Sequence, residues 1–282
     1  MQPFTSPLIS AEALLQLRPT GDVRLIDART GPGIAERYAE AHLEGALLVD
    51  LEHQLADTSG DPVEGGRHPL PTLAAFGEVL QQLGISPESH VVVYDDKNGA
   101  NAAARFWWML RALGHEKVQV LDGGMQAALK AGFPLGSGVE TPQNAGPYPA
   151  TTWQLPLADI HAVEIAAQNP QATVVDVRDA YRYQGISEPI DLIAGHIPGA
   201  INMPFSANLD ENGRFRSPEA LRELYQPLMA DKNPGQVIIH CGSGVTACHT
   251  LLALAHAGFE IPALYVGSWG EWSRTGRDVG KA

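Results

Sequence analysis

The stretch that decides the fold lies late in the chain and reads Val237-Ile238-Ile239-His240-Cys241-Gly242-Ser243-Gly244-Val245-Thr246-Ala247-Cys248. Its first residues form a short apolar, β-branched run, which predicts a buried strand. The two glycines predict a loop, and a helix is expected to begin near Thr246. Because ligands bind at the carboxyl ends of strands in open α/β sheets, the pattern predicts a functional loop at Cys241.

The pattern around this stretch belongs to an internal repeat. Apolar runs at 23–29 and 172–178 both end in Asp-x-Arg, and related Gly-containing segments lie at 41–46 and 195–200. The chain has 282 residues, against about 150 residues for a typical domain. Repeat and length together predict two copies of one α/β domain, in which strands alternate with helices.

We therefore predict an N-terminal domain over 1–137, a linker rich in Gly and Pro over 138–152, and a C-terminal domain over 153–282. Each domain is expected to contain a mainly parallel sheet flanked by helices. The clearest expected helices cover 73–83 and 102–113 in the first copy, and 158–168, 218–228 and 246–257 in the second.

Composition excludes several classes of protein. Apolar residues make up 44% of the chain and charged residues 18%, with a net charge of −13. This is a globular mix, and its acidic balance argues against binding to nucleic-acid backbones or anionic membranes. The cysteines, Cys241 and Cys248, are too few for a disulfide framework. We expect reduced thiols and a cytoplasmic location.

The loop after the strand favours anion chemistry at Cys241. Gly242 and Gly244 allow successive N–H groups to converge, and the following helix adds positive potential. Such surroundings favour a thiolate, which makes a cysteine nucleophilic. The alternative is a buried apolar cysteine before a turn. In the first copy the aligned position is Asp95, so that copy has no thiol there.

The segment 241–247 resembles the active-site loop of tandem-domain rhodaneses, the thiosulfate and 3-mercaptopyruvate sulfurtransferases. The resemblance covers nearly the whole chain, including both Asp-x-Arg strands and the segments 195–200 and 267–272. It implies two rhodanese-like domains, of which the first is non-catalytic. It also implies that Cys241 takes a sulfur atom as a persulfide and passes it to a thiol or cyanide, without a metal or organic cofactor.

The resemblance also implies roles for other residues. Ser243 and His68 are expected to act with Cys241 in catalysis, while Arg182 binds the anionic donor, as a guanidinium suits carboxylate or thiosulfonate oxygens. The loop residues expected to contact substrate are Gly242, Gly244, Val245 and Thr246. For Arg182 the alternative is a surface arginine, and for His68 a purely structural role at a domain interface.

The choice of donor depends mainly on Ser243, whose hydroxyl suits a carbonyl or enolate and favours 3-mercaptopyruvate. One departure from the family pattern is the absence of a second arginine between 186 and 192. Glu52 or Asp57 is expected as the acidic partner of His68. Cys248 is interpreted as a core or pocket-wall thiol, with a protective disulfide to Cys241 as the alternative.

Other functions remain open. The protein could be specific for thiosulfate, or a non-catalytic binding module with a rhodanese fold. A cysteine phosphatase is disfavoured because Ala247 stands where that class needs arginine. The expected partners are a small-molecule sulfur donor and a thiol or cyanide acceptor, with a thioredoxin-like protein as one candidate. We expect a monomer that binds neither nucleic acid nor membrane.

Overall fold

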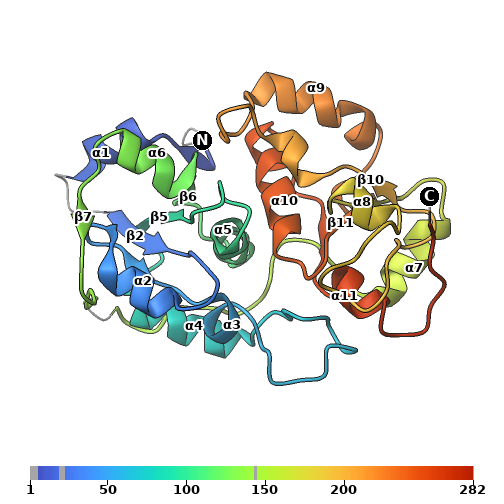
Figure 1. Ribbon diagram of the computed structural model, residues 1–282, viewed down its shortest axis with the longest axis horizontal. Helices are drawn as coiled ribbons and strands as arrows, with labels where there is room; N and C mark the ends of the chain where they lie inside the picture. Colours follow the sequence, from blue (N-terminus) through green and yellow to red (C-terminus); the bar gives the residue numbers. More distant parts are fainter. Residues whose placement is uncertain (1–5, 19–22, 143–144, 282) are drawn as a thin grey trace. The chain divides into compact units, whose positions relative to one another are not determined.

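The computed structural model describes residues 6–18, 23–142 and 145–281 (Figure 1). The chain divides into two compact units. The first unit comprises Met1–Leu55, Pro71–Gln154 and Asn212–Arg214. The second unit comprises Ala56–Leu70, Leu155–Glu211 and Phe215–Ala282.

The first unit is built on a five-stranded parallel sheet with strand order β1-β6-β5-β2-β4. The strands are β1 (Leu8–Ile9), β2 (Val23–Asp27), β4 (Leu47–Leu48), β5 (His90–Tyr94) and β6 (Val118–Leu121). A separate antiparallel pair joins β3 (His42–Leu43) to β7 (Leu135–Gly136). The inner strand β5 is largely buried, as expected for a parallel sheet covered on both faces.

Helices cover both faces of this sheet. Those of the first unit are α1 (Ala11–Leu17), α2 (Ile34–Glu40), α3 (Leu51–Gln54), α4 (Leu73–Gln82), α5 (Ala102–Ala112) and α6 (Gly124–Lys130). Figure 1 shows α1 and α6 on one side of the strands and α4 on the other. Several starts are fixed by side-chain caps; the Thr72 hydroxyl, for example, accepts from the Ala75 N–H before α4.

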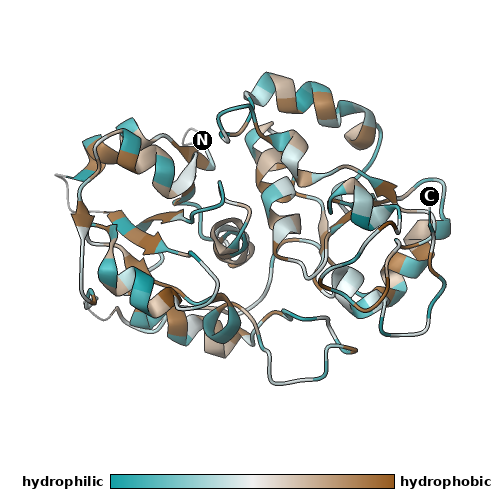
Figure 2. Cartoon of the chain, in the orientation of Figure 1, coloured by the Kyte–Doolittle hydropathy of each residue, from teal (hydrophilic) through white to brown (hydrophobic). Residues whose placement is uncertain are grey.

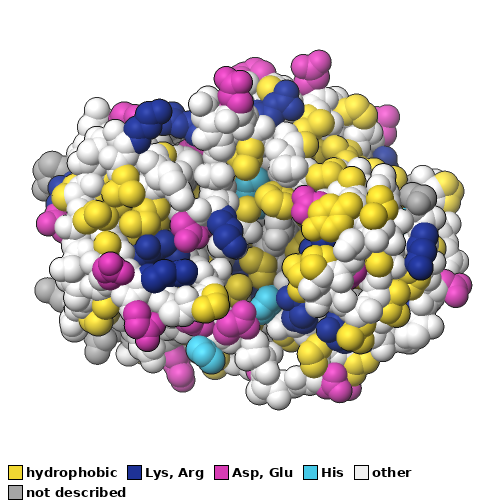
Figure 3. Space-filling view, in the orientation of Figure 1, with side chains coloured by type: hydrophobic (Ala, Val, Ile, Leu, Met, Phe, Trp, Pro, Cys, Tyr) yellow, Lys and Arg dark blue, Asp and Glu magenta, His cyan; other side chains and the backbone are white. Residues whose placement is uncertain are grey.

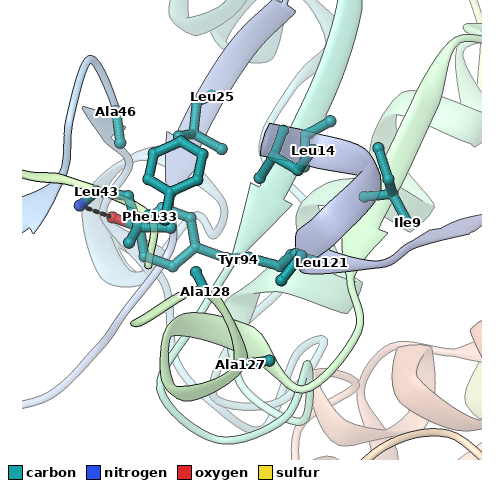
Figure 4. Close-up of a cluster of buried hydrophobic side chains, with 12 residues drawn as sticks. Ile9, Leu14, Leu25, Leu43, Ala46, Tyr94, Leu121, Ala127, Ala128 and Phe133 are labelled. Carbon is teal, nitrogen blue, oxygen red and sulfur yellow. Dashed lines mark hydrogen bonds between the residues drawn. The ribbon is translucent and has the colours of Figure 1, made fainter. Parts of the chain in front are cut away.

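The core of the first unit gathers around Tyr94, at the end of β5 (Figure 4). Its ring packs among Leu25, Leu121 and Phe133. Its hydroxyl accepts from the Leu43 N–H and donates to the Asp27 carboxylate. The polar end of this buried ring is therefore satisfied, which removes the penalty for an unpaired buried hydroxyl.

The second unit repeats the sheet, with order β10-β9-β11-β12-β8 and parallel pairing throughout. Its strands are β8 (Leu157–Ala158), β9 (Thr173–Asp176), β10 (Ile201–Asn202), β11 (Val237–His240) and β12 (Ala263–Tyr265). Read from β8 to β10, this is the order of the first unit. The predicted repeat of two α/β folds is confirmed.

The helices of the second unit are α7 (Ile160–Gln168), α8 (Ala180–Tyr183), α9 (Pro218–Met229), α10 (Thr246–His256) and α11 (Ser268–Trp272), with 3₁₀ turns η2 (Phe205–Asn208) and η3 (Pro234–Gln236). Figure 2 shows apolar residues concentrated on the strands and polar residues on outward turns of the helices. A core of Val174, Ile238, Tyr265 and Trp269 joins the sheet to this helical layer.

The two copies share detailed contacts as well as topology. Arg29 binds the Asp27 carboxylate through Nε and Nη2, and Arg178 binds Asp176 in the same way. In both copies the arginine also donates to a backbone carbonyl that precedes a histidine, at Ala41 and Gly195. The repeated Asp-x-Arg pattern thus marks a buried ion pair that fixes the loop after a strand.

The segment 56–70 differs from the predicted domain limits, because it belongs to the second unit although it lies within 1–137. Its attachment is polar: the Gly65 N–H donates to Glu271, and Arg67 forms an ion pair with Asp191. The position of this segment in the sequence does not reveal that it belongs to the second unit, because the chain returns to the first unit at Pro71. Over 138–142 and 145–152, where a linker is predicted, the described residues form neither helix nor strand.

No helix in the described part of the chain combines the length and apolarity needed to cross a membrane. On the face shown in Figure 3, basic and acidic side chains are interspersed rather than gathered by sign.

Candidate active site

Cys241 lies directly after β11, where the sheet of the second unit ends, and is buried. Its N–H donates to the Ser268 hydroxyl at 3.2 Å, and its carbonyl accepts from the Trp269 N–H at 3.0 Å. Ser268 has a left-handed backbone, with φ of +57°. The backbone of Cys241 is thus held on both sides by the start of α11.

The loop from Gly242 to Val245 leads into α10. Gly244 has φ of +73°, and a Cβ there would lie 2.6 Å from the Val266 carbonyl oxygen, so this position requires glycine. In the described chain, the N–H groups of Gly242, Ser243, Val245 and Thr246 donate to no acceptor. They leave the loop and the helix N-terminus with donors for an anion.

In the first unit, the corresponding loop after β5 surrounds a carboxylate with N–H donors. Asp95, directly after β5, is buried, and its carboxylate accepts from the N–H groups of Lys97, Gly99, Asn101 and Ala103 at 2.8–3.4 Å. In the repeat, Asp95 occupies the position of Cys241. The first copy therefore carries its own negative group in the nest of amides.

Arg182, on α8, lies beside the loop. Its Nη2 would be 3.3 Å from a Cβ on Gly242. It donates twice to Glu188 through Nε, and through Nη2 to Glu188 at 2.8 Å and to Asp191 at 3.3 Å. Burial disfavours its charge, yet the bonds and charge of Glu188 raise the pKa of the guanidinium above its ordinary value.

Two further arginines meet Asp191, whose side chain is fully buried. Arg67 donates to it through Nε at 2.9 Å, and Arg274 lies 3.4 Å from the same oxygen. Nη2 of Arg67 would be 3.1 Å from a Cβ on Gly242. Arg67, Glu188 and Asp191 are not among the predicted site residues. The sequence signal for Glu188 and Asp191 is a pair of carboxylates that closely follows Arg182.

His68 and Ser243 form a hydrogen bond, with 2.8 Å between Nδ1 and Oγ. Both side chains are largely buried in the second unit. The segment that carries His68 is fixed by Glu271, which accepts from the Gly65 N–H at 3.0 Å and from the Tyr265 hydroxyl at 2.8 Å. The imidazole of His68 is thus hydrogen-bonded to the hydroxyl of Ser243, two residues after Cys241.

The two candidates for an acidic partner of His68 differ. Asp57 accepts from both the N–H and the hydroxyl of Ser59, which lower the pKa of its carboxyl. Glu52 lies on α3, in the first unit. The role of either residue toward His68 stays a prediction.

Cys248 is buried in the first turn of α10, and its thiol donates to the Gly244 carbonyl at 3.2 Å. This contact supports the interpretation as a packing thiol.

His249, on the same helix, stacks on Phe215 with 4.4 Å between ring centroids. Among the residues with described positions, no group of three or more His, Cys, Asp or Glu could hold a metal ion.

The structure therefore brings most of the predicted site together in the second unit. Arg182 and His68 approach the loop that follows Cys241, which contains Gly242, Ser243, Gly244, Val245 and Thr246. Cys241 and Arg182 also interact electrostatically. The site combines a thiol, unpaired amides, guanidinium groups and a histidine–serine pair, which suits transfer of a group through a cysteine-bound anion.

Comparison with known proteins agrees with this chemistry. The Rhodanese-like domain family matches twice, at residues 10–131 and 160–275. A probable 3-mercaptopyruvate sulfurtransferase of Pseudomonas aeruginosa is 39% identical over 273 residues, covering 95% of each chain. Mouse thiosulfate sulfurtransferase is 38% identical over 275 residues, covering 94% of this chain and 89% of its own.

A solved structure extends the likeness to three dimensions. The crystal structure of a 3-mercaptopyruvate sulfotransferase from Escherichia coli has a TM-score of 0.79 and 30% identity, covering 94% of this chain and 99% of that one. Fold and site define a sulfurtransferase built from two rhodanese domains. The chain belongs to the tandem-domain rhodanese family of 3-mercaptopyruvate and thiosulfate sulfurtransferases.

Proposed function

We propose that this sulfurtransferase takes sulfur from 3-mercaptopyruvate and passes it to a thiol or cyanide through a persulfide on Cys241. The observation that carries the choice of donor is the hydrogen bond between His68 and Ser243. Ser243 lies two residues after Cys241 in the chain. The pair is therefore near the place where a proton must reach the enolate that leaves the donor sulfur. Relatives named for 3-mercaptopyruvate support the same choice.

In the first half of the reaction, the Cys241 thiolate attacks the donor sulfur. The S–S bond forms as the C–S bond breaks, and its electrons leave with the carbon as the enolate of pyruvate. The proton of the donor thiol ends on that carbon, so thiolate and mercaptopyruvate give persulfide anion and pyruvate. Charge and atoms balance without an external oxidant or reductant.

Ser243 and His68 serve the leaving group in this proposal. The hydroxyl of Ser243 donates to the developing enolate oxygen, and the imidazole of His68 holds that hydroxyl and exchanges its proton. The arrangement requires the imidazole within hydrogen-bonding distance of the hydroxyl, and 2.8 Å meets that requirement. A thiosulfate donor would release sulfite, which needs no proton at carbon.

The second half returns the enzyme to its starting state. A thiolate or cyanide attacks the outer sulfur, the S–S bond breaks, and Cys241 leaves as thiolate. Between the two half-reactions, while Cys241 carries the persulfide, the amides of the loop hold the negatively charged outer sulfur. Asp95 supports this step, because it lies at the matching place in the first unit and its carboxylate accepts four N–H contacts from the loop there.

A thiosulfate-specific enzyme is the second candidate. The arginines beside Gly242 suit a dianion, and the mouse thiosulfate sulfurtransferase is nearly as similar as the Pseudomonas relative. The test is a comparison of kcat/KM for 3-mercaptopyruvate and thiosulfate with cyanide as acceptor. We expect 3-mercaptopyruvate to be the better donor; faster turnover of thiosulfate would reject this assignment.

Variants make the comparison sharper. Ser243→Ala is expected to lower kcat/KM for 3-mercaptopyruvate about 100-fold, as loss of a proton-transfer group does, and to change thiosulfate turnover much less. Intact mass after donor treatment should show one added sulfur in the wild type and none in Cys241→Ser. Absence of that gain in the wild type would favour a non-catalytic binding module.

A further inference from the structure

The first turn of α11 holds the backbone at the nucleophile. The Cys241 N–H donates to the Ser268 hydroxyl, and the N–H groups of Trp269 and Gly270 donate to the carbonyls of Cys241 and Gly242 at 3.0 and 2.8 Å. Three successive residues of one short helix therefore fix the residue that reacts and the one that follows it. The rest of the active-site loop takes its position from this backbone.

The next residue of the helix reaches a different part of the chain, the segment 56–70 that carries His68. One carboxylate oxygen of Glu271 accepts from the Gly65 N–H at 3.0 Å, and the other accepts from the Tyr265 hydroxyl at 2.8 Å. Both oxygens of the carboxylate are thus engaged in charge-assisted hydrogen bonds. The segment, which the structure describes throughout, contains neither helix nor strand, so its position depends on contacts of this kind.

The residue before α11 meets the same segment through backbone alone. Gly66 is buried and has φ of +82°, and a Cβ on it would overlap the Gly267 carbonyl oxygen and lie 2.9 Å from the Gly267 Cα. A Cβ on Gly65, where φ is +91°, would instead lie 3.4 Å from the ring of Pro69. The close approach at Gly66 therefore places the segment directly against the start of α11.

These contacts join the two halves of the histidine–serine pair. His68 comes from the segment and Ser243 from the active-site loop, and 2.8 Å separates Nδ1 from Oγ. A single side-chain hydrogen bond contributes little to stability, so it follows the placement of the two backbones rather than determining it. The start of α11 contacts both backbones, which makes it the common support of the two side chains.

We propose that Glu271 is a positioning residue of the reaction, which holds the backbone three residues before His68 and thereby keeps the imidazole on the Ser243 hydroxyl while a proton passes to the leaving enolate. In this role Glu271 acts through Gly65 and does not itself transfer the proton. The inference rests on the proposed function and deepens it by naming the residue that sets the geometry of the proton-transfer pair.

Two substitutions at Glu271 separate its hydrogen bond from its charge. Glu271→Ala removes the acceptor for the Gly65 N–H, whereas Glu271→Gln keeps an oxygen there and offers an amide N–H to the Tyr265 hydroxyl. We expect kcat with 3-mercaptopyruvate to fall about tenfold in Glu271→Ala, because small displacements of catalytic groups are costly, and to change less than about twofold in Glu271→Gln. With thiosulfate, which needs no proton at carbon, kcat should change less than about twofold in both variants.

A double variant tests whether Glu271 acts through the histidine–serine pair. In Ser243→Ala, Glu271 has no pair left to position, so adding Glu271→Ala should lower kcat with 3-mercaptopyruvate no further. A further tenfold fall in the double variant, an equal fall for both donors, or a Glu271→Gln variant as slow as Glu271→Ala would each overturn the proposal. An unchanged kcat in Glu271→Ala would do the same.

Gly66→Ala and Gly65→Ala form a matched pair, since both place alanine at a positive φ and only the first meets the backbone of Gly267. We expect Gly66→Ala to lower kcat with 3-mercaptopyruvate at least as much as Glu271→Ala does, and Gly65→Ala to lower it less than about threefold. Equal falls in the two variants would mean that backbone strain rather than contact with Gly267 is responsible, which contradicts the proposal.

Hydrogen exchange tests the placement of the segment without any turnover. Because Glu271→Ala removes the acceptor of the Gly65 N–H, amide exchange in a peptide covering 64–68 should be about tenfold faster than in the wild type, and nearly unchanged in Glu271→Gln. Unchanged exchange in Glu271→Ala would overturn the proposal. Exchange does not depend on sulfur transfer, so failure of the wild type to gain sulfur from 3-mercaptopyruvate would reject the proposed function separately.

Discussion

At the scale of single residues, Ser268 shows how a strained position can serve a reactive one. Its φ of +57° is a conformation that favours glycine, and the repeat has Gly124, with φ of +58°, at the matching place. Serine is kept there although a left-handed non-glycine residue costs about 1–2 kcal/mol. Its hydroxyl supplies the compensation, because it accepts from the Cys241 N–H and donates to the Tyr265 carbonyl.

Two substitutions separate the strain from the hydrogen bonds. Ser268→Ala keeps the strain and loses the hydroxyl, whereas Ser268→Gly loses the hydroxyl and relieves the strain. We expect both to slow persulfide formation about tenfold, since a small displacement of the nucleophile is costly. In chemical unfolding, Ser268→Gly should be more stable than Ser268→Ala by about 1 kcal/mol. Equal stabilities would show that the backbone there is unstrained.

At the scale of elements, the loop between α8 and β10 holds the arginines of the site through buried carboxylates. Glu188 accepts from Arg178 and Arg182 and from the N–H groups of Ile190 and Asp191. Burial raises the pKa of Glu188, but the bonds from Arg182 and the two amides outweigh it and lower the pKa below its ordinary value. The charged form is therefore bound more strongly in the folded protein.

This shift predicts how stability depends on pH. A carboxyl with a lowered folded pKa contributes stability above its unfolded pKa of 4.5, and that contribution is lost as pH falls through the folded value. Glu188→Gln should lower the free energy of unfolding by roughly 2 kcal/mol at neutral pH, with the gap closing below about pH 4.5. A gap that stays constant with pH would contradict this assignment.

Glu164→Gln is the control for that measurement. Glu164 pairs with Arg277 at 3.4 Å, but its side chain is 43% exposed. Exposed ion pairs contribute about 0–1 kcal/mol, because water screens the charges. We therefore expect little loss of stability from this substitution and little change with pH.

At the scale of the whole molecule, the repeat explains what could be predicted. Strand periodicity and the paired Asp-x-Arg segments define the two sheets, because these patterns depend on residues adjacent in sequence. The helix expected at 246–257 is found as α10, Thr246–His256. Residue types after a strand also predict Cys241 as the nucleophile. The place of Arg67 in the site depends on its contact with Asp191, which joins segments distant in sequence and which no local periodicity encodes.

The repeat also leads to a prediction about the first unit, where Asp95 is an internal counterpart of the nucleophile. Burial raises the pKa of Asp95 from 3.8 to about 6, although four backbone N–H groups favour its charged form. A raised folded pKa means that the folded state holds a proton which the unfolded state releases between these values. Stability from this group is present below pH 3.8 and is lost as pH rises through about 6.

Asp95→Asn removes the titration and keeps the shape. Wild type and variant are unfolded in denaturant at a series of pH values, and the difference between their free energies of unfolding is plotted. Between about pH 4.5 and pH 7, that difference should move by about 2 kcal/mol in favour of the variant, because the wild type alone has to bury a charge. The absolute offset reflects how well the amide meets the four N–H donors, so the slope is the measured quantity. Parallel curves would mean that these donors hold Asp95 ionised throughout, and that the first copy encloses its anion without a cost that depends on pH.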